Sequence, residues 1–106
     1  MTQDKTKTQQ IEEIEEMIRS TAQKHGIHAI PAYSDELEAF IMLGLIEING
    51  VECYITPEYP RLPLWVALQY RNSLQEEIAY FVKEWHKTMN TIRNAIEEQQ
   101  LERCRE

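Results

Sequence analysis

An apolar repeat in the C-terminal third constrains the fold more than any other feature of the chain. From Ser73 onward, apolar side chains recur every three or four residues, and neither glycine nor proline interrupts them. This spacing places the side chains on one face of an α-helix, as in the seam of a coiled coil. We therefore predict a helix within residues 64–102 whose apolar seam consists of Leu74, Ile78, Phe81, Trp85, Met89, Ile92 and Ile96.

The length of this helix indicates that one other helix cannot cover it. About 29 helical residues extend roughly 43 Å, whereas a compact chain of about 100 residues has a radius of gyration near 13 Å. A second amphipathic helix is predicted from Gln9, with apolar residues at three- and four-residue steps from Ile11 to Ala22, and Gly26 ends it. About 17 residues of helix span only about 26 Å. We therefore expect a second copy to cover the remaining seam in a homodimer.

Between these helices the sequence predicts a short helix. Residues 27–33 form an extended connection, and Ser34 is a favourable N-cap. The helix is expected from Asp35 to about Leu43, and Gly44 stops it.

A β-hairpin over residues 45–55 is the clearest local prediction. Asn49-Gly50 is the favoured pair for a two-residue type I′ turn. This turn sets the register of the flanking strands. It predicts the cross-strand pairs Ile48 with Val51, Glu47 with Glu52, Ile46 with Cys53 and Leu45 with Tyr54.

The connection to the C-terminal helix contains three prolines and a candidate break. Pro57, Pro60 and Pro63 predict an extended crossing over residues 56–63. A helical segment then begins near Leu64. Ser73 and Glu76 have capping-box spacing, so the helix either continues through Asn72 or restarts there.

Together these elements predict a mainly α fold of the α+β class. We expect an antiparallel bundle of long helices with one β-hairpin. Residues 1–8 are polar and without periodicity, and we interpret them as a disordered tail. Residues 9–106 form a single helical domain, because 106 residues suffice for one domain.

The charge of the chain is concentrated in its middle third. The net charge is −7. Residues 27–63 contain six acidic residues and one basic residue, Arg61, so this segment alone carries −5. Such a segment repels phosphates and attracts a basic partner. It therefore argues against direct nucleic-acid binding.

No motif indicates catalysis, a metal or a cofactor. Three glycines are too few for glycine-rich phosphate loops, and two cysteines make neither a disulfide framework nor a zinc site. No nucleophile lies beside a base. We expect a protein that is not an enzyme and has no cofactor, no metal and no membrane association. We place it in the cytoplasm, since no signal peptide follows Met1.

One stretch resembles part of a winged-helix DNA-binding domain. The run from Phe40 to Glu47 (FIMLGLIE), followed by a turn and by Tyr54 to Pro57 (YITP), resembles the end of a helix and the wing of such domains. The resemblance covers about twenty residues and implies a dimeric transcription regulator. The corresponding helix and wing of this chain carry acidic residues where phosphate contacts need lysine and arginine.

These observations predict an acidic interaction protein, an adaptor or inhibitor, that docks on a basic protein and mimics the charge of nucleic acid. One alternative is the winged-helix regulator. Another is a small-ligand binder with a pocket at a dimer interface lined by Trp65, Tyr70, Tyr80 and Trp85. The basic partner is expected to bind Asp35, Glu36, Glu38, Glu47, Glu52, Tyr54, Glu58 and Tyr59.

Overall fold

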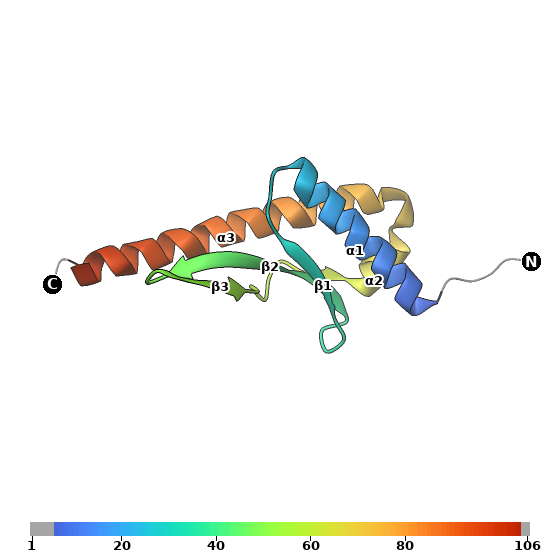
Figure 1. Ribbon diagram of the computed structural model, residues 1–106. Helices are drawn as coiled ribbons and strands as arrows, with labels where there is room; N and C mark the ends of the chain where they lie inside the picture. The colour runs from blue at the N-terminus through green and yellow to red at the C-terminus, as the bar shows by residue number, and fades with distance from the viewer. Residues whose placement is uncertain (1–5, 105–106) are drawn as a thin grey trace, which may run out of the picture.

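A computed structural model describes residues 6–104 as a mixed fold of helices and an antiparallel sheet. A long helix runs along one side of the sheet, and the molecule is elongated, with a radius of gyration of 16.4 Å (Figure 1). In chain order the elements are α1 (Lys7–Lys24), β1 (Ile30–Ser34), β2 (Ala39–Ile48), β3 (Val51–Ile55), β4 (Leu62–Pro63), α2 (Leu64–Gln69), the 3-10 turn η1 (Arg71–Ser73) and α3 (Leu74–Cys104).

The core lies between α3 and the inner face of the sheet. β2 is the central strand: β1 pairs with one of its edges, and β3 and β4 pair with the other. The alternating side chains Phe40, Met42 and Ile46 of β2 are buried against α3. Gly44 lies in the same row, and it lets Trp85 and Met89 of α3 approach the strand closely.

The prediction of a short helix over residues 35–43 is wrong. Residues 35–38 form the turn between β1 and β2, and β2 begins at Ala39. Ser34 does accept a hydrogen bond from the Leu37 N–H, at 3.3 Å, but it caps this turn. Glu38 has a φ of 49°, a left-handed conformation that no helix interior allows. Gly44 therefore stops no helix and instead lies in the middle of a strand.

The hairpin predicted over residues 45–55 has the expected register and turn. All four predicted pairs are present, and the pairing extends to Gly44 and Ile55. Asn49 and Gly50 have φ values of 53° and 82°, as a type I′ turn requires. β2 nevertheless starts six residues before Leu45, so the hairpin is one part of a larger sheet.

Helix α1 begins earlier than predicted and is not part of an antiparallel bundle. Thr6 and Gln9 form a capping box, so Lys7 and Thr8, which we expected in the tail, are helical. Residues 1–5 of that tail lie outside the described residues. Figure 1 shows α1 crossing the first turns of α3 at a steep angle. The buried Thr21 Oγ1 joins the two helices by accepting a 2.9 Å hydrogen bond from Gln75 Nε2.

The apolar seam of α3 is covered within one chain. Its first five side chains, from Leu74 to Met89, are buried, and Ile92 and Ile96 pack against the same core. The sheet supplies the cover that we expected from a second copy. The homodimer therefore stays a prediction. The reason for it, an uncovered apolar seam on α3, is not present in this structure. The helix also breaks near Asn72, at η1.

A buried hydroxyl without a partner gives a stability prediction. Tyr33 packs its ring 5.2 Å from that of Phe40, and its hydroxyl is buried with no hydrogen bond. Tyr33→Phe should raise the free energy of unfolding by about 1 kcal/mol, because an unpaired buried polar group is costly. Urea unfolding followed by circular dichroism measures the change. A loss of stability would mean that the hydroxyl has a partner in solution.

Candidate functional site

The outer face of the sheet, opposite α3, is apolar although no described element covers it. The strand register places the side chains of Ile30, Leu43, Leu45 and Tyr54 beside one another on this face. Ile30 is 47% exposed, Leu45 41% and Tyr54 60%. An antiparallel sheet with one open face normally alternates, with apolar side chains inward and polar ones outward. Here the alternation fails, and the four residues form a surface that we call the outer apolar strip.

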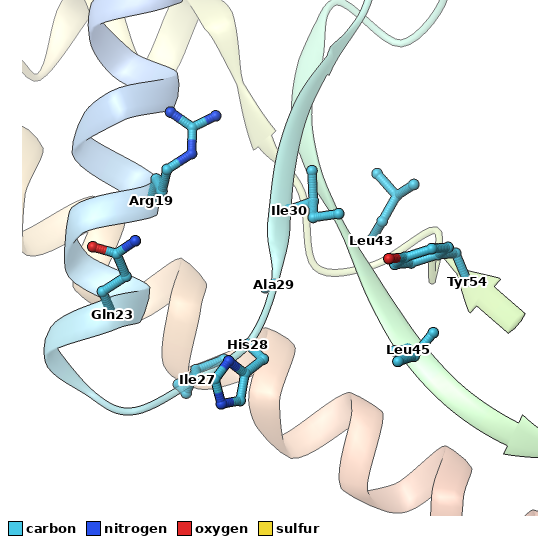
Figure 2. A pocket seen from close by; sticks show the side chains of 9 residues that line it. All are labelled: Arg19, Gln23, Ile27, His28, Ala29, Ile30, Leu43, Leu45 and Tyr54. Carbon is cyan, nitrogen blue, oxygen red and sulfur yellow. The ribbon is translucent and has the colours of Figure 1, made fainter. Parts of the chain in front are cut away.

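A groove of about 310 Å³ runs along the outer apolar strip. All four residues of the strip line it, and Figure 2 shows Arg19 and Gln23 of α1 on one side with Tyr54 on the other. Residues 27–29, which connect α1 to β1, also contribute to its lining. The groove is therefore apolar along the sheet and polar at its α1 side.

Two opposed carboxylates border the strip at its hairpin end. Glu47 and Glu52 are directly paired across β2 and β3 on the outer face, and both are exposed. Within residues 6–104 neither forms an ion pair. Like charges placed opposite each other on neighbouring strands destabilise a sheet. This end of the strip therefore favours an approaching cation.

The acidic residues predicted as one site are divided between places far apart. Asp35, Glu36 and Glu38 lie in the turn at one end of β2, whereas Glu47 and Glu52 lie at the other end. Nine steps along a strand span about 30 Å. The turn residues and the hairpin pair therefore do not act as one compact contact.

The remaining predicted residues lie in the connection between β3 and β4. Glu58 and Tyr59 are both exposed. The Arg61 guanidinium lies over the Tyr59 ring, 4.7 Å from its centroid, and Arg61 Nη2 donates to the Tyr59 hydroxyl at 3.3 Å. The acidic segment's single cation is thus engaged locally.

The residues of the small-ligand alternative differ widely in exposure within one chain. Trp85 is 1% exposed in the core, whereas Tyr80 on the same helix is 67% exposed and Trp65 62%. Cys53 is a free, half-buried thiol. In the part of the chain that the structure describes, no three histidine, cysteine or acidic side chains gather as metal ligands do. No helix within residues 6–104 is both long and apolar enough to span a bilayer.

Sequence reasoning missed the outer apolar strip and the groove. Ile30, Leu43 and Leu45 were assigned to a connection, a helix end and a hairpin, so they were never placed on a common face. The available signal was the run from Ala39 to Ile46, eight residues without a polar side chain. Such a run is typical of a strand covered on both faces as well as of a buried helix.

The segment that resembles a winged-helix domain forms a strand in this fold. Phe40 to Glu47 belongs to β2, so the helix that the resemblance implies is absent from it. The chain matches no protein family model, no curated protein and no solved structure.

Proposed function

We propose that this protein is a non-enzymatic interaction protein that docks the hairpin end of its outer sheet face on a basic surface of another protein. The observation that carries the proposal is the outer apolar strip with Glu47 and Glu52 at its end. Contiguous exposed apolar patches with a polar rim mark interaction sites. Aromatic anchors such as Tyr54 are enriched in the centres of protein interfaces.

The charge of the site supports a basic partner. A lysine or arginine placed between Glu47 and Glu52 offsets their mutual repulsion. Binding the partner is therefore electrostatically more favourable for each of these carboxylates than for an isolated one. A surface that binds nucleic acid has the required lysines and arginines. We therefore propose a nucleic-acid-binding protein as the partner, blocked or recruited through carboxylates placed where phosphates would lie.

Charge reversal at the hairpin should strongly weaken this docking. The double variant Glu47→Lys/Glu52→Lys is expected to bind the partner at least tenfold more weakly, which is about 1.4 kcal/mol, because it places like charges opposite the basic surface and such juxtaposition is costly. The experiment uses the tagged protein as bait in native lysate at low salt. The bound proteins are eluted with a salt step and identified. Wild type is expected to release a basic protein, since salt screens such contacts.

The matched control is Glu97→Lys/Glu98→Lys. Both residues are exposed on α3, and this variant changes the net charge as much as the hairpin variant does. It should retain the basic protein. Equal losses in the two variants would show that net charge, and not the hairpin, attracts the partner. Capture of nucleic acid without a basic protein would contradict the proposal.

A further inference from the structure

Within residues 6–104, one edge of the central strand has no partner strand over half its length. β1 covers residues 39–43 of β2, whereas β2 continues to Ile48. Among residues 6–104, no strand pairs with that side of β2 beyond Leu43. Figure 1 shows β2 extending well past the end of β1, beneath α3 in this view.

The main-chain groups of Leu45 and Glu47 point to this open edge. In a hairpin with a two-residue loop, Ile48 and Val51 form the first hydrogen-bonded pair, and such pairs alternate along the strands. Gly44, Ile46 and Ile48 therefore direct their main-chain groups toward β3, and Leu45 and Glu47 direct theirs away. Arg93 Nη2 of α3 donates to the Leu45 carbonyl at 3.2 Å, which agrees with this direction, and an added strand must displace Arg93 or share this carbonyl with it.

The space beside the edge is open and partly apolar. Figure 2 shows residues 27–29 diverging from β2 just before Ile30, so the chain that precedes β1 leaves the edge uncovered. The groove described above begins at this point, where Ile27, Ala29 and Leu45 contribute to its lining. An extended segment placed here would have α3 on one side and solvent on the other.

We infer that an extended, basic segment of the partner adds to this edge as a strand, antiparallel to β2 and in line with β1. This inference rests on the proposed function and names how the partner binds. In such strand addition the main chain supplies the hydrogen bonds and alternate side chains supply specificity. Opposite Glu47 the segment presents lysine or arginine on the outer face. Opposite Leu45 it presents an apolar side chain to the groove.

The probe is the acetylated and amidated peptide Lys-Val-Lys-Val-Leu, added to the full chain. Antiparallel pairing places its central lysine opposite Glu47 and its leucine opposite Leu45. Amide hydrogen exchange measured by NMR should show that the Leu45 and Glu47 N–H groups become protected. One control peptide is N-methylated on the central lysine and the leucine, and the other on the two valines. Only the first loses N–H groups that face β2, so it should bind about tenfold more weakly.

Each other outcome overturns the inference. Equal binding of the two methylated peptides would mean docking by charge without strand pairing, and protection of Glu52 and Tyr54 would place the strand on the edge of β3. No protection with the unmethylated peptide at millimolar concentration would exclude strand addition. None of these results touches the proposed function, which fails separately if the partner binds Glu47→Lys/Glu52→Lys as well as wild type.

Discussion

Replacing Gly44 with valine is expected to lower the free energy of unfolding by about 3 kcal/mol or more. A Cβ atom at this position would lie 2.5 Å from Met89 Cε and 2.8 Å from Trp85 Cζ2. The methionine end can move, but the indole ring is buried and hydrogen-bonded. Adding atoms to a packed core forces such neighbours out of position. Because small domains have only about 5–15 kcal/mol of stability, this change removes much of it.

The control for Gly44 is Gly26. A Cβ atom at Gly26 would meet no atom within 4 Å, so replacing Gly26 lowers stability only through its backbone φ of 67°. Gly26→Ala should therefore cost about 1–2 kcal/mol through backbone conformation alone. The losses of stability in Gly44→Ala and Met89→Ala should not add in the double variant, because the alanine at position 89 leaves room for the methyl group added at position 44. Urea unfolding of wild type, the two single variants and the double variant Gly44→Ala/Met89→Ala measures this coupling. Full additivity would show that α3 does not press on β2 at Gly44.

Truncating Trp85 to alanine is expected to cost about 3–5 kcal/mol. This side chain is the largest in the core, and its Nε1 donates to the Met42 carbonyl at 3.0 Å. On the edge of β2 opposite β1, β4 pairs with residues 39–40 and β3 pairs with residues 44–48. No strand in the described part of the chain therefore lies beside residues 41–43 on this edge, and the Trp85 indole supplies the hydrogen bond that a strand would give the Met42 carbonyl.

Two comparisons separate the packing of Trp85 from its hydrogen bond. Trp85→Phe keeps an aromatic ring but leaves the Met42 carbonyl unpaired, which should cost about 1–3 kcal/mol. Trp65→Ala removes the other tryptophan, which is 62% exposed, and should change stability by less than about 0.5 kcal/mol. Chemical denaturation monitored by far-ultraviolet circular dichroism measures all three. If Trp65→Ala costs as much as Trp85→Ala, the core is not where the structure places it.

The acidic site shows how far local patterns predict a surface. The pair of Glu47 and Glu52 was predicted from the register of a two-residue turn, because a hairpin turn determines which residues oppose each other. The grouping of this pair with Asp35, Glu36 and Glu38 came only from their closeness in sequence. Once residues 39–48 are a strand, its length separates the two groups.

Two features were determined by the sequence alone because their causes are local. The Asn49-Gly50 dipeptide adopts the positive φ values of its turn with little strain, whatever surrounds it. The apolar repeat runs from Leu74 to Ile96 within a helix of 31 residues, and this length leaves no ambiguity about the spacing of its apolar side chains.

Tertiary structure decided the state of residues 35–44. The apolar residues from Ala39 to Ile46 fit either a helix or a strand, and local preference does not separate the two. Pairing with β1 and β3, together with the packing of α3 on the inner face, settles the choice. These are contacts between segments distant in sequence. The same contacts determine the role of Gly44 and the open edge of β2. Gly44 permits a close approach only because α3 packs on β2, and an edge is unpaired only relative to the strands that lie beside it.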